Sequence, residues 1–283
     1  MALLTGALAS PKNKAFSVPS FKVVSSIPTV FGVVPKQLDV WGNTTWGDCV
    51  SAEEAAAKAM YSNQCGLPET FITADTITSW ARQHGYLNGA VITEVMDTMI
   101  STGITSAGVN YKDGQYSSVD WTDSSLLSAA IYQGPVKLGV AAGQLQKVYQ
   151  PNNGWWGTGF HQNKNTDHCT NVCGYGTADA LADLMKSTKP SSLNGGTICY
   201  LLFTWGSIGI IDEASLNAIT DEAWLRNPTT VGQAPAPAPI PTPIPVPIPP
   251  PGPIPVYPFS GSYQVGVYNI SWTATLNDPP PLP

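Results

Sequence analysis

The sequence predicts a mixed α+β domain followed by a polyproline II segment and a short β segment. Helical and strand patterns alternate between Gly-rich loops from Val34 to Arg226, as expected of an α+β domain. Beyond this domain, Pro occupies almost every second position between 234 and 258. Apolar and polar residues then alternate between 262 and 276, as in a half-buried strand or hairpin. The expected regions are an extended N-terminal arm over 1–33, the α+β domain over 34–226, the Pro-rich segment over 227–258 and the β segment over 259–283.

The composition supports a folded domain and excludes nucleic acid as the main partner. With 283 residues and 43% hydrophobic content, the chain can bury a core of ordinary size. It carries 13 Lys and Arg residues against 19 Asp and Glu residues, and the basic residues form no cluster. Nucleic-acid binding needs a basic surface, so DNA and RNA are not expected as partners.

The cysteine count and the apolar runs indicate in which cellular compartment the protein resides. Five cysteines are too few for a disulfide scaffold, and their odd number leaves at least one thiol unpaired. We therefore expect reduced thiols in an intracellular compartment. The N-terminal sequence MALLTGALAS lacks the positive region of a secretory signal. No run approaches the ~18 apolar residues of a membrane-spanning helix, so no membrane segment is expected.

The Pro-rich segment is expected to be extended. Each Pro between 234 and 258 fixes its own φ and biases the preceding residue to extended conformations, which excludes helix and central strand. This predicts a polyproline II rod that could reach about 75 Å at ~3.1 Å per residue. A semi-rigid linker is the simplest role, and a docked strap or a recognition ligand are the alternatives.

The β segment that follows is too small to fold alone, because a two-stranded hairpin is at best marginally stable in water. Between 227 and 283 the only charged side chain is Asp278, which is unlike a free disordered tail. We therefore expect this segment to pair with another protein by adding to its sheet. A homo-oligomer is compatible with the same pattern.

The first candidate for chemistry is Cys49, in WGNTTWGDCVSAEEAAAKAM. A Gly-rich turn ends at Asp48, and a helix-favouring run begins at Cys49. The partial positive charge at a helix N-terminus favours a thiolate, which suits a nucleophile. The neighbouring carboxylate of Asp48 opposes this by raising the thiol pKa. From this segment alone, a buried structural cysteine is the simpler interpretation.

The second candidate is His168, in NTDHCTNVCGYG, which is typical of a strand ending in a Gly-Tyr-Gly turn. On a strand, His168 and Thr170 share one face, and Cys169 and Cys173 take the other. A structural, hydrogen-bonded histidine is the simpler interpretation of this segment. The two cysteines lack a second matched pair, so no metal is expected.

Taken together, these segments resemble the papain-like cysteine peptidases. The order of the landmarks carries the resemblance: Cys49 opening a helix, Gly-Pro-Val at 134–136, His168 before a Gly-Tyr-Gly turn, and Trp205-Gly206 in FTWG. The resemblance covers the whole α+β domain. It implies a helical half and an antiparallel β half, with Cys49 as the nucleophile and His168 as the base that deprotonates it. Trp205 and Gly206 would pack over this pair and limit water access.

The resemblance also shows two departures at supporting positions. The Gln that donates to the oxyanion lies six residues before the nucleophile in this family, and here Asn43 stands there. The Asn that orients the histidine is replaced by Phe203, which accepts no hydrogen bond. Three polar residues near His168 are not expected to replace this Asn: Asp167, Asn165 and Asn171. Of the other histidines, His161 is expected to be a surface residue and His84 a residue at a helix end.

The segments WGDCVSAEEAAAKA, FTWGSIGIID and EAWLRNPTT look like those of uncharacterised papain-fold proteins from tailed bacteriophages and soil proteobacteria. With the substituted supporting positions, this favours a pseudoenzyme acting as a structural or decoration subunit of a large assembly, such as a phage virion. Such a protein would be made in the bacterial host cytoplasm and contact capsid or other virion proteins through its tail; residence in the bacterial cytoplasm is the alternative. The alternative function is an active peptidase or amidase using Cys49 and His168. No cofactor is expected.

Overall fold

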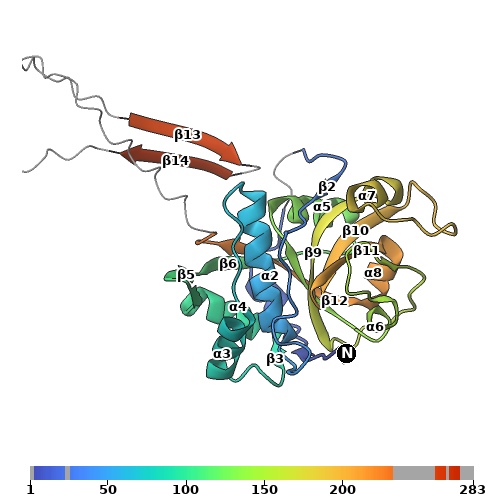
Figure 1. The fold of residues 1–283 in the computed structure, drawn as a ribbon, viewed down its shortest axis with the longest axis horizontal. Coiled ribbons are helices and arrows are strands. Elements are labelled where there is room, and N and C mark those ends of the chain that lie inside the picture. Colours follow the sequence, from blue (N-terminus) through green and yellow to red (C-terminus); the bar gives the residue numbers. More distant parts are fainter. Residues whose placement is uncertain (1–2, 23–25, 232–258, 266–267, 275–283) are drawn as a thin grey trace, which may run out of the picture. The chain divides into compact units, whose positions relative to one another are not determined.

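The computed structural model describes residues 3–22, 26–231, 259–265 and 268–274 (Figure 1). Its internal contacts divide the chain into one unit over 1–234 and a second over 235–283. The polyproline II rod predicted within 227–258 lies outside the described residues from 232 onward. The helices of the first unit are α1 (Lys14–Ser17), α2 (Cys49–Gln64), α3 (Ala74–His84), α4 (Ile92–Ser101), α5 (Ser124–Gln133), α6 (Leu145–Val148), α7 (Ala178–Met185) and α8 (Glu213–Ile219).

The main sheet of the described chain has eight strands and is largely antiparallel. Seven of them lie in the order β6-β12-β7-β9-β10-β11-β8, and β2 pairs separately with β9. Only the β11–β8 pair of this sheet is parallel. The sheet strands are β2 (Phe31–Gly32), β6 (Asp113–Ser118), β7 (Val136–Val140), β8 (Trp156–Gly157), β9 (His168–Thr177), β10 (Ile198–Thr204), β11 (Ser207–Asp212) and β12 (Thr220–Pro228).

Two small pairs complete this unit. They are the parallel pair of β1 (Ala7–Leu8) with β3 (Ala90–Val91) and the antiparallel pair of β4 (Ile104–Ser106) with β5 (Val109–Tyr111). Figure 1 shows α2, α3 and α4 gathered on one side of the main sheet. The predicted α+β class, with a helical half and an antiparallel β half, is confirmed.

Both faces of the sheet are buried, which explains the apolar character of its central strands. On β10, Leu201 belongs to the core shared with α2 and α4, whereas Leu202 belongs to the core on the other face, with α5 and α8. Alternate side chains of a strand point to opposite faces, so one strand supplies both cores. The long helix α2 is buried along nearly its whole length, which suits its run of Ala.

A buried cluster of charges joins α2 to the sheet. The Lys137 ammonium on β7 lies 2.9 Å from Glu53 Oε2 and 2.5 Å from Glu54 Oε1, and both carboxylates are on α2. Arg226 on β12 donates from Nε to Glu54 Oε2 at 3.0 Å and pairs with Glu53 through Nη2. All four residues are buried. Two positive and two negative charges thus satisfy each other across the join, as buried charges require.

The second unit contains a β-hairpin. Strand β13 (Phe259–Val265) pairs antiparallel with β14 (Tyr268–Ala274), in a register that runs from Phe259 opposite Ala274 to Val265 opposite Tyr268. The period-two pattern predicted a strand or hairpin here, and the hairpin forms. Its pairing with another protein stays a prediction. In the described part of the chain, no helix is both long enough and apolar enough to span a bilayer.

Candidate active site

Cys49 is positioned by a tight turn and by the first turn of α2. Trp41 and Gly42 open the turn with φ of 46° and 91°. Helix α2 then begins at Cys49, and the N–H group of Ser51 donates to the carbonyl of Asp48 at 2.9 Å. Cys49 is only 2% exposed. The thiol therefore lies at the helix N-terminus, as the sequence predicts, but beneath the surface.

His168 opens β9 and contacts two residues at the end of the β10–β11 hairpin. Its Nε2 lies 2.7 Å from Thr204 Oγ1. The Trp205 indole stacks on the imidazole, with ring centroids 4.3 Å apart and an interplanar angle of 17°. Trp205 and Gly206 form the two-residue turn of the hairpin, with φ of 44° and 84°, which matches the positive φ values of a type I′ turn. The turn thus holds the indole over the imidazole.

Cys49 and His168 line the same cavity, whose volume is about 10 Å³. Asn43, Phe203 and Trp205 line it as well. A space of this size is at the lower limit for one water molecule. His168 Nδ1 is buried and has no hydrogen-bond partner among the described residues, so it makes no hydrogen bond to the Cys49 thiol. The fold therefore brings the two side chains together around a small gap.

Burial keeps both side chains uncharged in this state. It raises the pKa of Cys49 to about 12, against the opposing effect of the backbone N–H of Cys169, while the Asp48 carboxylate raises it further. Burial also lowers the pKa of His168 to about 3. The pKa of Asp48 itself rises to about 7 because its carboxyl group is buried. A neutral thiol thus faces a neutral imidazole, because burial outweighs the helix N-terminus that was expected to favour a thiolate.

Residues 3–10, which we name the cover segment, lie over this site. The carbonyl of Leu4 accepts a hydrogen bond from Trp205 Nε1 at 2.9 Å. The N–H groups of Gly6 and Ala7 both donate to the carbonyl of Asp167, at 2.9 and 3.1 Å, immediately before His168. A backbone N–H of Ala7 also lies close enough to the Cys49 thiol to lower its pKa. The N-terminal arm was expected to be extended, but nothing in the sequence indicated that it covers the site.

Three glycines let the cover segment approach the nucleophile turn. A Cβ atom on Gly6 would lie 1.9 Å from the carbonyl oxygen of Gly47, two residues before Cys49. A Cβ on Gly89 would lie 2.8 Å from the carbonyl oxygen of Gly6, and Gly89 has φ of 113°. The N–H of Ala90 donates to that same oxygen at 2.9 Å. Only glycine can occupy these positions at such close approach.

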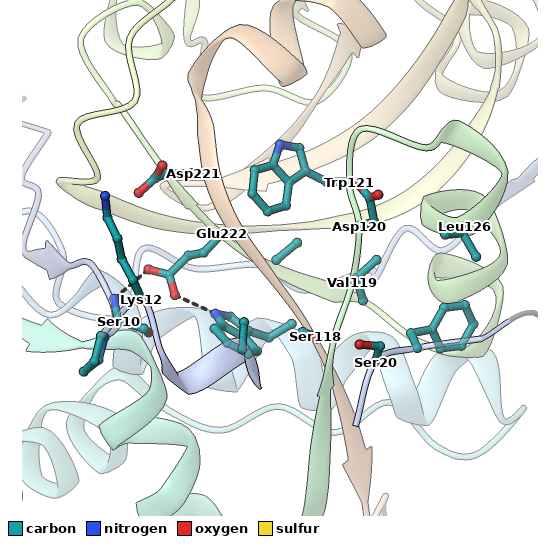
Figure 2. Close-up of a pocket in the computed structure, with 15 residues that line it drawn as sticks. Ser10, Lys12, Ser20, Ser118, Val119, Asp120, Trp121, Leu126, Asp221 and Glu222 are labelled. Carbon is teal, nitrogen blue, oxygen red and sulfur yellow. Dashed lines mark hydrogen bonds between the residues drawn. The ribbon is translucent and has the colours of Figure 1, made fainter. Parts of the chain in front are cut away.

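A larger cavity, of about 480 Å³, lies elsewhere and shares no lining residue with the one at Cys49. Figure 2 shows it between the N-terminal arm and the ends of β6 and β12, with Trp121 on one side. The Glu222 carboxylate inside it is already occupied, because it accepts hydrogen bonds from the Ser10 N–H and from Trp224 Nε1. Among the described residues, no group of three or more His, Cys, Asp or Glu side chains is placed to hold a metal ion.

The arrangement of elements matches cysteine proteases of known structure. No protein-family model matches this sequence, and no curated protein does. Xylellain, a cysteine protease from Xylella fastidiosa, superposes with a TM-score of 0.54 at 15% identity, covering 79% of this chain and 96% of xylellain. A structure from work on the mite allergens Blo t 1 and Der p 1 gives 0.55 at 14% identity, covering 76% and 77%. Bromelain from Ananas comosus gives 0.50 at 14%, covering 71% and 99%.

The chain has a papain-like fold. The family resemblance stated from the sequence is confirmed at the level of the fold, and identities this low show the fold alone. The resemblance to phage and soil proteobacterial proteins stays a prediction.

The papain-like fold places the supporting residues as follows. Asn43 lines the cavity, but its side-chain amide donates to the carbonyl of Trp46 at 3.1 Å. Phe203 is buried against Trp41, with ring centroids 5.9 Å apart. Gly206 closes the turn beside Trp205. Asn43 is therefore near the site with its donor engaged, and the Phe203 side chain has no polar group that could orient the imidazole.

The other polar residues considered from the sequence serve elsewhere in the papain-like domain. Asp167 Oδ1 accepts from the N–H of Ala142 at 2.8 Å, and Asn171 Nδ2 donates to Glu53 at 2.9 Å. Asn165 and His161 are exposed, and His84 ends α3. The residue that hydrogen-bonds to the imidazole is Thr204, which the sequence analysis missed. Its position in the FTWG motif could have indicated this role, because Thr204 directly follows the position where the family has the orienting Asn.

Proposed function

We propose that this chain is a cysteine hydrolase of the papain type that acts on peptide or amide bonds and is held in a latent state by its cover segment. One observation carries the proposal: the papain-like fold brings Cys49, His168 and Trp205 around one cavity, with His168 Nδ1 buried and unpaired. A buried nitrogen without a hydrogen-bond partner lowers the stability of the fold, and a catalytic role is one explanation for its retention. An unpaired Nδ1, on a ring that shares a cavity with a thiol, is free to act as a general base.

In the reaction, His168 Nδ1 takes the proton of Cys49, and the thiolate attacks the substrate carbonyl carbon to form a tetrahedral adduct. The adduct collapses to a thioester as the imidazolium gives its proton to the leaving amine. Water, deprotonated by the same imidazole, then hydrolyses the thioester and restores the thiol. The N–H groups of Ser51 and Ala52 donate to the Asp48 carbonyl, so the oxyanion would be held by the N–H of Cys49 and by Asn43 once its amide leaves Trp46.

Latency follows from the same burial that sets the two pKa values. With the cover segment in place there is no room for a substrate, and the proton stays on sulfur because the thiol pKa of about 12 lies far above that of His168, about 3. Opening the segment hydrates both groups, which lowers the thiol pKa and raises the imidazole pKa. The proton transfer then becomes accessible.

Hydrolysis of a broad peptide library tests the proposal. The full chain is expected to be nearly inactive, and Gly6→Ala, which cannot keep the cover segment in place, is expected to hydrolyse part of the library. Adding Cys49→Ala or His168→Ala to that variant should abolish turnover. A folded Gly6→Ala chain with an alkylatable Cys49 and no turnover of any peptide would reject the hydrolase.

A second candidate is the structural or decoration role in a phage virion, and the sealed, uncharged site is compatible with it. Its other support, the Pro-rich segment, lies outside the described residues. Mass spectrometry of purified particles from the source phage should then find the intact chain at high copy number, and its absence from particles would reject this role. Loss of incorporation on deletion of 234–283 would identify the tail as the anchor.

A further inference from the structure

We infer that Thr204 is the positioning residue for His168, replacing the amide that the papain-like pattern has at Phe203. This inference rests on the proposed hydrolase, because it assigns His168 Nδ1 as the base. Thr204 Oγ1 and His168 Nε2 lie 2.7 Å apart, and both residues are 1% exposed. No other hydrogen bond reaches this imidazole within the described part of the chain.

Thr204 is itself held firmly in place. It is the last residue of β10 and pairs with Ser207 across the Trp205-Gly206 turn. One residue earlier, the carbonyl of Phe203 accepts a hydrogen bond from the Thr170 hydroxyl, which links β10 to β9 two residues after His168. The backbone that carries Thr204 is therefore anchored on both sides, so its hydroxyl can orient the ring.

The direction of this hydrogen bond sets which ring nitrogen carries the proton, and our inference is that Thr204 Oγ1 is the acceptor. When Thr204 Oγ1 accepts from Nε2–H, the proton of the neutral ring sits on Nε2 and the lone pair sits on Nδ1, the unpaired nitrogen of a ring that lines the same cavity as Cys49. The opposite tautomer would place N–H on Nδ1, and the ring could not accept the thiol proton. The stacked Trp205 indole covers one face of the ring and opposes its rotation. Thr204 and Trp205 together thus fix a ring orientation suited to a base.

Nitrogen NMR of histidine tests this without requiring turnover. The chain has three histidines, so ¹⁵N-histidine labelling gives three ring systems, and His84→Gln and His161→Gln assign the other two. In the full chain, the His168 ring should carry its proton on Nε2. Thr204→Val removes the acceptor at almost constant volume and should shift the ring toward Nδ1–H, whereas Thr204→Ser should retain Nε2–H. A proton on Nδ1 in the full chain, or an unchanged tautomer in Thr204→Val, would overturn the inference.

Turnover provides a second readout in the Gly6→Ala background. General base catalysis contributes about 100-fold to 10,000-fold, so misorienting the base through Thr204→Val should lower kcat by about 10-fold to 100-fold with little change in KM. Thr204→Ser should recover most of the rate. If no variant turns over but the tautomers respond as stated, the hydrolase fails and the positioning role stands. If Gly6→Ala is active and Thr204→Val matches it, the positioning role fails and the hydrolase stands.

Discussion

Replacing Gly6 by Ala should expose Cys49 while leaving the domain folded. The new Cβ would lie 1.9 Å from the Gly47 carbonyl oxygen, and that neighbour is backbone in the nucleophile turn, so it cannot move aside. Residues 6 and 7 of the cover segment must shift instead. This local displacement breaks three backbone hydrogen bonds, from Gly6 and Ala7 to Asp167 and from Ala90 to Gly6, and leaves the hydrogen bonds of Leu4 and Ser10 in place.

The size of the effect follows from these three bonds. Each contributes about 1 kcal/mol net, so the covered state loses about 3 kcal/mol relative to the open one. The lower chain entropy of Ala offsets this by about 0.5 kcal/mol. Because 1.4 kcal/mol is a factor of ten, the open fraction should rise by roughly 50-fold to 100-fold. The rate of Cys49 alkylation should rise by the same factor when opening is fast compared with the chemistry.

The assay is iodoacetamide labelling at pH 8, followed by peptide mass spectrometry of each cysteine. Partly exposed Cys65 serves as the reference thiol, and buried Cys173 reports global unfolding. The matched control is Gly143→Ala, because a Cβ there meets nothing within 4 Å. A folded Gly6→Ala chain whose Cys49 reacts within about threefold of the parent rate would refute the reasoning, since the three bonds predict more. Equal acceleration at Cys173 would show that the whole domain had loosened.

Three further predictions concern stability, each measured by urea unfolding. Burial lowers the pKa of His168 from 6.5 to about 3, so the stability contributed by its neutral form is fully present above pH 6.5 and is lost as the pH falls through 3. The contribution is at most about 5 kcal/mol. His168→Gln should flatten the acid limb of the stability profile, and an unchanged profile would contradict the assignment. Burial raises the pKa of Asp48 from 3.8 to about 7, so the stability contributed by its protonated form is present below pH 3.8 and lost as the pH rises through 7. At pH 8, Asp48→Asn should therefore be more stable than the parent chain. Equal stability at pH 8 would argue against a buried carboxyl group. Lys137→Met leaves the buried carboxylates of Glu53 and Glu54 with Arg226 alone and should cost about 3–5 kcal/mol of stability. The control is Lys147→Met at an exposed position, which should change stability by less than about 0.5 kcal/mol. Similar losses in the two variants would show that the buried cluster is not stabilising.

The sequence predicted the parts of this protein that local pattern and motif order determine. The helix that begins at Cys49 follows from a Gly-rich turn before an Ala-rich run, and the strand that begins at His168 follows from its apolar residues and glycines. The papain-like fold came from the order of these landmarks. The β-hairpin near the C-terminus came from period-two alternation, which is a local signal.

Contacts between residues distant in the sequence could not be predicted in this way. Thr204 is 36 positions from His168, and no period in the sequence shows that β10 brings its hydroxyl to the ring. Gly6 gave no signal either, because its role depends on Gly47 and Gly89, which lie on other loops. The size of the thiol pKa shift has a similar cause: the helix N-terminus and Asp48 are visible in the sequence, but the depth at which Cys49 is buried is not.

The charge cluster that joins α2 to β7 and β12 restricts how the molecule can open. Moving α2 away from β7 and β12 would separate Glu53 and Glu54 from Lys137 and Arg226 in a dry interior, at a cost of several kcal/mol. Displacing Gly6 and Ala7 of the cover segment breaks three backbone hydrogen bonds and separates no charged groups. We therefore expect access to the site to be controlled by the eight residues of the cover segment. The charge cluster should hold α2 to the sheet with little dependence on salt, since buried charges are poorly screened.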